Sequence, residues 1–218
     1  MIDTVDILQK VIIWGPGILF AITLHEWAHG YVASRFGDPT PGMMGRLTLN
    51  PLPHIDWMWT VVVPILLLYT TGFAFGGAKP VPINPRYFRG SFRTALFWVS
   101  AAGPLMNLFL AALCALAIRG AYYLPAFFAI PLLGMLKAAI VVNVVLAVFN
   151  LFPLPPLDGG RVLAVLLPSS LGRYWASLDR YGLVLVAILA MSGIMGKMIN
   201  PVTGWFLALF AGVASLGG

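Results

Sequence analysis

The stretch ITLHEWAHGYVASRFG, residues 22–37, places polar side chains inside a long apolar run of the chain. This run covers about residues 7–35, and His25, Glu26 and His29 lie in its second half. It is long enough to cross a bilayer, which takes about 20 helical residues. A charged side chain at the centre of a membrane helix costs at least about 2.5–3.5 kcal/mol on insertion scales. Glu26 is the only glutamate of the chain, so we expect these residues to form a functional site.

The composition is typical of an integral membrane protein. Of the 218 residues, 60% are hydrophobic and 9% are charged, whereas soluble domains carry about 25% charged residues. The length predicts a single domain, residues 1–218, with a core at about 7–165 and accessory helices at about 181–216. The net charge of +6 is interpreted as loop charge that orients the chain in the lipid bilayer. Basic runs with interleaved aromatic residues are missing, so no nucleic acid is expected as a partner.

The apolar runs predict an all-α polytopic membrane protein with about five to six transmembrane segments. Five runs are long enough to cross or deeply enter a bilayer: 7–35, 94–118, 132–152, 181–196 and 201–216. A sixth run, 57–75, carries Pro64 in its middle and precedes GGAKPVPINP, residues 76–85. We interpret 57–75 as a re-entrant element and 76–85 as a short extended segment. Non-helical backbone at membrane depth requires protein or a water-filled cavity around it, so a re-entrant element indicates an enclosed, hydrated site.

The basic residues support the re-entrant interpretation. If segment 57–75 returns to the side it left, nine Lys and Arg residues share one face and four share the other. The nine are Arg35, Arg46, Lys79, Arg86, Arg89, Arg93, Arg161, Arg173 and Arg180, and the four are Lys10, Arg119, Lys137 and Lys197. If all six runs crossed, the split would be eight against five. The stronger bias agrees better with the positive-inside rule and puts the HEWAH end of the first helix near the cytoplasm.

The spacing of the two histidines predicts a metal site. His25 and His29 are four residues apart, so they lie on one face of a helix, one turn apart. H-E-x-x-H is the zinc metallopeptidase signature, in which both imidazoles bind Zn²⁺. Glu26 is then placed to take a proton from a water that the metal activates. The alternative is a polar cluster that hydrogen-bonds between helices, which the cost of a charge in the membrane disfavours.

A catalytic zinc takes three protein ligands and keeps one position open. No second glutamate exists, so the third ligand must be His54 or an aspartate. Asp158 is favoured because it ends an apolar helix and precedes two glycines, which allow close approach of the backbone to another element. The charge count also places Asp158 and His29 at the same membrane face. His54, in NPLPHIDW (50–57), is the weaker candidate because its surroundings indicate a loop at the membrane surface.

Taken together, these motifs resemble those of the site-2 protease family, the intramembrane zinc metalloproteases of peptidase family M50. HEWAH matches the family's H-E-x-x-H, and NLFPLPPLDG (150–159) matches its N-x-x-P-x-P-x-L-D-G. SAAGPLMN (100–107) is similar to the A-G-P-x-x-N element of the family's middle core helix. GGAKPVPINP looks like the segment that members place beside the active site.

The resemblance implies that His25, His29 and Asp158 bind one zinc ion per chain, with Glu26 as general base and then acid. It implies a compact member from a prokaryotic cell membrane, without a PDZ-like insertion, whose site opens towards the cytoplasm. Its substrates would be membrane proteins, cleaved in or near a transmembrane helix. Asn150 and Asn107 are candidates for binding the substrate or stabilising an oxyanion. The alternative for both amides is hydrogen bonding between helices.

Segment 76–85 could also offer an extended edge to an unwound substrate, although its prolines limit strand pairing. Two other functions compete with proteolysis. A zinc transporter would usually show further polar ligands and inverted repeats, neither of which is visible in the sequence. A catalytically silent scaffold would not need the intact HExxH and LDGG motifs.

Overall fold

The computed structural model describes residues 4–62 and 79–215. This part of the chain is helical, with no strand among the described residues. The longer helices are α1 (Thr4–Arg35), α4 (Phe92–Ala121), α5 (Ala126–Asn150), α6 (Asp158–Leu166), α7 (Ser169–Ser177), α8 (Asp179–Met191) and α9 (Ile194–Ser215). The short ones are α2 (Thr40–Met43), η1 (Leu52–His54), η2 (Trp57–Val62) and η3 (Pro85–Tyr87). The predicted all-α class is thereby confirmed.

Four helices are long and apolar enough to cross a bilayer, namely α1, α4, α5 and α9. Helices α7 and α8 meet at a bend of 66° and together could form a fifth span. The predicted crossing at 181–196 is shorter than expected, because α8 has 13 residues and reaches only about 20 Å. The last span begins at Ile194 instead of near residue 201, because α9 is continuous through Pro201. Neighbouring helices allow such a proline in a membrane helix.

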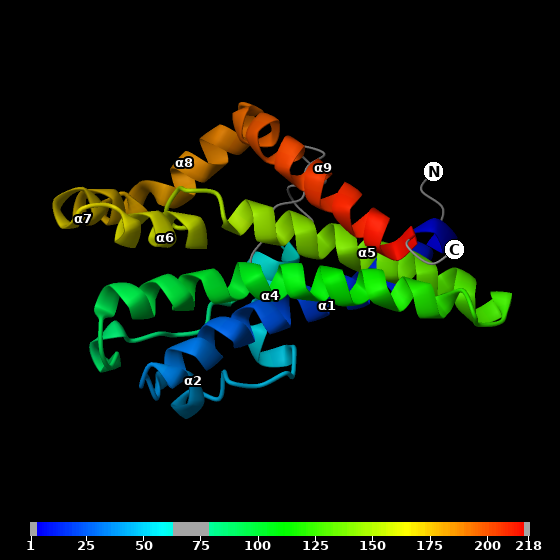
Figure 1. Cartoon of the computed structure of the whole chain (residues 1–218), viewed down its shortest axis with the longest axis horizontal. Coiled ribbons are helices and arrows are strands. Elements are labelled where there is room, and N and C mark those ends of the chain that lie inside the picture. Colours follow the sequence, from blue (N-terminus) through cyan, green and yellow to red (C-terminus); the bar gives the residue numbers. More distant parts are fainter. Residues whose placement is uncertain (1–3, 63–78, 216–218) are drawn as a thin grey trace.

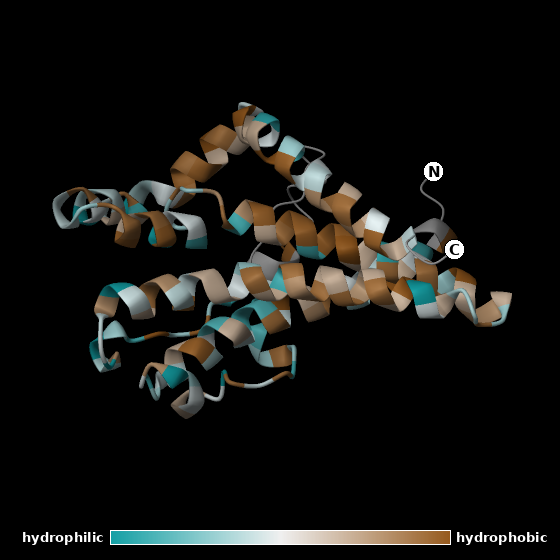
Figure 2. Cartoon of the chain, viewed as in Figure 1, coloured by the Kyte–Doolittle hydropathy of each residue, from teal (hydrophilic) through white to brown (hydrophobic). Residues whose placement is uncertain are grey.

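The centre of the molecule is a bundle of α1, α4 and α5, with α9 packed along α4 and α5 (Figure 1). Small side chains let these helices approach closely, as is usual between membrane helices. Ala111 and Ala115 of α4 are fully buried against Val144 of α5 and Phe210 of α9. Figure 2 shows that apolar residues prevail along α5, which has the highest mean hydropathy of the four spans. The bundle thus presents apolar side chains both to its own interior and to lipid.

The segment between α1 and α4 makes no net crossing of the bundle. Helix α1 ends, and α4 begins, at the same end of the molecule (Figure 1). There the backbone N–H of Arg89 donates a 2.7 Å hydrogen bond to the carbonyl of Phe36. The ends of the two flanking helices are therefore placed as the predicted return requires. The re-entrant element itself lies largely outside the described residues, which stop at Val62 and resume at Lys79.

Lys137 does not lie where the charge count assumes. The predicted span 132–152 would place it near a membrane surface, but α5 begins six residues earlier, at Ala126. Lys137 is therefore eleven residues from the start of α5 and thirteen from its end at Asn150. The prediction that Lys137 counts as a loop charge in the positive-inside bias is wrong, because the residue lies in the middle of a span.

Helix α6 is tied to the start of α4 by Arg93. The Arg93 guanidinium donates to the carbonyls of Val165 (2.9 Å from Nε) and Leu167 (2.6 Å from Nη2). These carbonyls end α6, where backbone acceptors have no partner within the helix. Since α6 begins at Asp158, Arg93 fixes the far end of the helix that carries the predicted metal ligand.

We expect Arg93→Ala to lower the affinity for zinc by about 10-fold, as loss of an outer contact of a metal site does. The cause is a less firmly held α6, and a zinc titration of the purified protein measures it. Arg161→Ala is the matched control, because Arg161 is an exposed arginine on α6. Equal zinc affinities in the two variants would contradict this positioning role.

Candidate metal centre

Three buried side chains from α1 and α6 converge on one point. The Nε2 atoms of His25 and His29 are 3.1 Å apart. The Oδ2 atom of Asp158 lies 3.3 Å from the first and 3.2 Å from the second. Each residue is less than a tenth exposed. In residues 4–62 and 79–215, this is the one group of three or more His, Cys, Asp or Glu side chains close enough to share a metal ion.

The triangle has the dimensions of a zinc site. Zn²⁺ lies about 2.0–2.1 Å from a histidine nitrogen and prefers a tetrahedral arrangement. Two ligand atoms at that distance and angle are about 3.3 Å apart. The three observed separations, 3.1, 3.2 and 3.3 Å, therefore suit one zinc ion with a fourth position open.

Hydrogen bonds from the other imidazole nitrogens fix both rings. His25 Nδ1 lies 2.5 Å from Asn107 Oδ1, and His29 Nδ1 lies 2.6 Å from the carbonyl of Val99. Both partners are acceptors, so each Nδ1 carries the proton. The Asn107 amide is oriented by its own donors, because Nδ2 bonds to the carbonyl of Ala21 and to Asn143 Oδ1.

These tautomers leave three acceptors facing one another. Both Nε2 atoms then carry lone pairs, and the buried Asp158 Oδ2 has no hydrogen-bond donor. Buried acceptors without a donor are unfavourable, and three within contact distance repel one another. A cation at their centre removes this conflict, and Zn²⁺ accepts such a nitrogen and oxygen donor set.

Glycine makes room for this centre on α4. A β-carbon at Gly103 would lie 2.6 Å from Nε2 of His25 and closer still to Nε2 of His29. Only a residue without a side chain fits there, so α4 can lie directly against the two imidazoles. Gly103 belongs to the SAAGPLMN motif, and its contact with the metal ligands is a role that the sequence motif does not specify.

Two further glycines shape the start of α6. A β-carbon at Gly159 would overlap the carbonyl of Leu151, and one at Gly160 would overlap the backbone of Pro155. The first turn of α6 therefore folds tightly against the turn that follows α5. This close approach, expected from the LDGG sequence, directs Asp158 back towards α1.

Glu26 lies beside the metal group without being part of it. It is half-buried, and its Oε2 accepts a 2.8 Å hydrogen bond from the backbone N–H of Val81. Val81 belongs to residues 79–84, which have no regular secondary structure. The segment is also tied down by Lys79 N–H, which donates to the carbonyl of His54, and by Asn84 N–H, which donates to Asp38. The predicted extended segment thus holds the carboxylate of Glu26.

The other candidate site residues make hydrogen bonds away from the metal group or behind it. His54 is fully buried away from the metal group, and its Nε2 lies 3.1 Å from the carbonyl of Thr48. Asp38 is buried, and its carboxylate accepts the backbone N–H groups of Thr40 and Asn84. Among the described residues, the side chain of Asn150 donates only to the carbonyl of Leu146 in its own helix. Substrate binding by Asn150 and Asn107 stays a prediction, although the Asn107 amide is engaged with His25 and Asn143.

We expect Gly103→Ala to lower zinc affinity by at least about 100-fold, beyond the usual effect of losing an outer contact. The added methyl group would occupy the space of the two imidazole nitrogens. Gly120→Ala is the matched control on the same helix, because a β-carbon there meets nothing within 4 Å. Zinc content of the purified variants measures the effect, and a fully loaded Gly103→Ala protein would contradict the packing described above.

Asn107→Ala and Asn150→Ala should separate the two asparagines. Removing Asn107 takes away the acceptor that orients His25, so zinc affinity should fall about 10- to 100-fold. Removing Asn150 should leave zinc affinity unchanged, because its amide bonds only within α5. Competition with a fluorescent zinc chelator gives both affinities. A drop for Asn150→Ala equal to that for Asn107→Ala would count against the assigned orientation of His25.

Comparison with known proteins agrees with this site. The family model for peptidase family M50 matches residues 120–192, which include Asp158 but not the two histidines. The chain is 36% identical over 204 residues to "Putative zinc metalloprotease YwhC" of Bacillus subtilis, covering 90% of each chain. It is 32% identical to "Putative zinc metalloprotease Rip2" of Mycolicibacterium smegmatis, covering 91% of this chain and 74% of the relative.

The Rip2 protein of Mycobacterium tuberculosis (strain H37Rv) is 30% identical over 88% of this chain and 72% of the relative. No solved structure matches the chain. These three relatives match over 88–91% of the chain. The chain therefore belongs to peptidase family M50, the site-2 protease family, and is a zinc-dependent peptidase built into an integral membrane protein.

Proposed function

We propose that this peptidase hydrolyses peptide bonds in or near transmembrane segments of other membrane proteins, as in regulated intramembrane proteolysis. The supporting observation is the depth of the metal group. His25 lies ten residues before the end of α1 at Arg35, about 15 Å along the helix axis. The hydrocarbon core of a bilayer is about 30 Å thick. This distance from the helix end supports a site within the bilayer, where transmembrane substrates, and not soluble ones, would present their peptide bonds.

In this proposal His25, His29 and Asp158 hold one zinc ion per chain, and Glu26 is the general base. When bound, zinc would polarise the scissile carbonyl and lower the pKa of a water molecule towards about 7. Glu26 takes the proton from that water and later passes it to the leaving amine. The N–H of Val81 holds Oε2 of Glu26, which leaves Oε1 as the atom that carries the proton.

The segment 79–84 would also limit how a substrate can bind beside Glu26. The N–H groups of Lys79, Val81 and Asn84 donate within the protein. Pro80 and Pro82 have no N–H group. Apart from the N–H of Ile83, this segment therefore offers carbonyl oxygens to an unwound substrate, which would supply most of the N–H donors of an added strand.

The site is proposed to open to the cytoplasmic side of a prokaryotic cell membrane. Arg35, Arg89 and Arg93 lie where α1 ends and α4 begins, which is the end of the bundle nearer the metal group. An excess of Arg and Lys in short loops marks the cytoplasmic side of a membrane protein. Transport of zinc is the less suitable function, because the described residues hold one metal group and no further ligand set along the bundle.

The decisive test is Glu26→Gln, which removes the base while keeping the shape of the side chain. We expect cleavage of a model transmembrane peptide in proteoliposomes to fall by about 100-fold or more. Zinc content should stay at the wild-type level, because Glu26 is not one of the converging ligands. Asp179→Asn is the matched control, since Asp179 is an exposed carboxylate at the start of α8.

Cleavage of the peptide by Glu26→Gln at the wild-type rate would reject the mechanism. Zinc flux into proteoliposomes that continues in Glu26→Gln would instead favour transport. Activity on soluble peptides with none on transmembrane peptides would reject the proposed substrate class while leaving the family assignment in place.

A further inference from the structure

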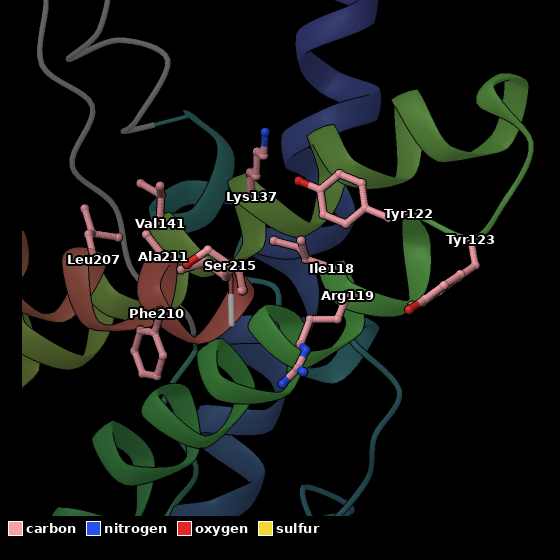
Figure 3. A pocket seen from close by; sticks show the side chains of 13 residues that line it. Ile118, Arg119, Tyr122, Tyr123, Lys137, Val141, Leu207, Phe210, Ala211 and Ser215 are labelled. Atoms are coloured by element: carbon pink, nitrogen blue, oxygen red, sulfur yellow. The ribbon is translucent and has the colours of Figure 1, made fainter. Parts of the chain in front are cut away.

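A cleft with basic side chains lies between α4, α5 and α9, away from the metal group. Its volume is about 990 Å³ (Figure 3). Most of its wall is apolar, formed by Ile118 of α4, Ile140 and Val141 of α5, and Leu207 and Phe210 of α9. The cleft is near the end of the bundle where α4 and α9 end, and the metal group is nearer the other end (Figure 1).

Lys137 is the unusual residue of this cleft. It lies in the middle of the α5 span and is exposed, with its side chain at the edge of the cleft (Figure 3). Among the described residues, it forms no ion pair or hydrogen bond. None of the described residues that line the cleft is acidic. A cation inside a membrane span nearly always has a partner or a function. We therefore expect Lys137 to bind an anion that is not one of the described residues.

Arg119 supplies a second cation closer to the membrane surface. It lies in the last turn of α4, two residues before Ala121, and flanks the same cleft. Lys137 is about 16 Å along α5 from the start of that helix. The flexible stem of a lysine lets its ammonium extend along the apolar wall towards the surface. Tyr122 and Tyr123 also line the cleft and are exposed, which suits aromatic hydroxyls at the level of lipid headgroups.

We propose that the cleft binds an anionic phospholipid. Its phosphate lies between Arg119 and Lys137, and an acyl chain lies along Ile140, Val141 and Phe210. A phosphate suits two neighbouring cations, because it forms charge-assisted hydrogen bonds with both. A transmembrane helix of a partner protein fits less well, because such helices are predominantly apolar and would bring no anion to Arg119 and Lys137.

The lipid would join α9 to the α4–α5 pair at the membrane face away from the site. Phe210 of α9 already packs there on the core formed by Ala115 and Ile140. An acyl chain beside these residues would extend that core, so its effect should be on the attachment of α9. The proposal does not depend on the reaction proposed above.

The test compares the full chain in nanodiscs of pure phosphatidylcholine with nanodiscs that contain one part in five of phosphatidylglycerol. Phosphatidylglycerol should raise the Tm of the wild-type protein by several degrees and should remain with it through detergent purification. Lys137→Gln and Arg119→Gln should each lose most of the retained lipid, and the double variant all of it. Lys197→Gln is the matched control, because this exposed lysine of α9 does not line the cleft.

A second variant tests the proposal independently, in case Lys137→Gln fails to fold. Ala211→Trp fills the cleft from α9 without removing a charge and should displace the lipid while zinc content stays unchanged. Equal Tm values in the two nanodiscs, or full lipid retention in both Lys137→Gln and Ala211→Trp, would overturn the proposal. The same Tm shift from inorganic phosphate in phosphatidylcholine nanodiscs would also overturn it, because the site would then recognise free phosphate and not lipid.

Discussion

The structure depends on the electrostatic repulsion among three buried hydrogen-bond acceptors that lie within contact distance. Nε2 of His25, Nε2 of His29 and Oδ2 of Asp158 lie 3.1–3.3 Å from one another, and none of the three has a proton to share once both Nδ1 atoms are protonated. Such a group is stable only around a cation. Helix α1 supplies two of the atoms and α6 the third, while α4 holds both rings from behind through Asn107 and Val99. A metal ion held by these atoms would join α1 to α6 beside α4.

Much of this could be predicted from the sequence because charges are rare in an apolar chain. The helix period places His25 and His29 on one face, and the basic residues indicate that the segment after α1 returns to its starting side. The hydrogen bond from Arg89 to Phe36 is in line with that return. Asp158 can then lie beside His29, although it is 129 residues further along the chain. The charge count favours the topology in which Asp158 and His29 share a membrane face. The loop surroundings of His54 make it the weaker candidate for the third ligand.

Other parts could not be predicted, because they depend on how helices face one another. Periodicity does not show that Gly103 lies against two imidazoles, or that the carbonyl of Val99 accepts a hydrogen bond from His29. Asn143 also has no motif to mark it, although it orients Asn107. The ends of helices also differ from those that hydropathy predicts. Helix α5 starts six residues before the predicted run, so Lys137 lies in its middle, and α9 starts before Pro201 and continues through it.

The glycines around the site have a consequence for how the protein tolerates change. At Gly103, Gly159 and Gly160 the available space is that of a hydrogen atom, and the neighbouring atoms are ring nitrogens or main chain that cannot yield. None of these positions carries a reactive group. Even so, a single methyl group at any of them would overlap those atoms and displace the elements that carry or contact the metal ligands. The geometry of the metal centre therefore depends on positions that have no side chain at all.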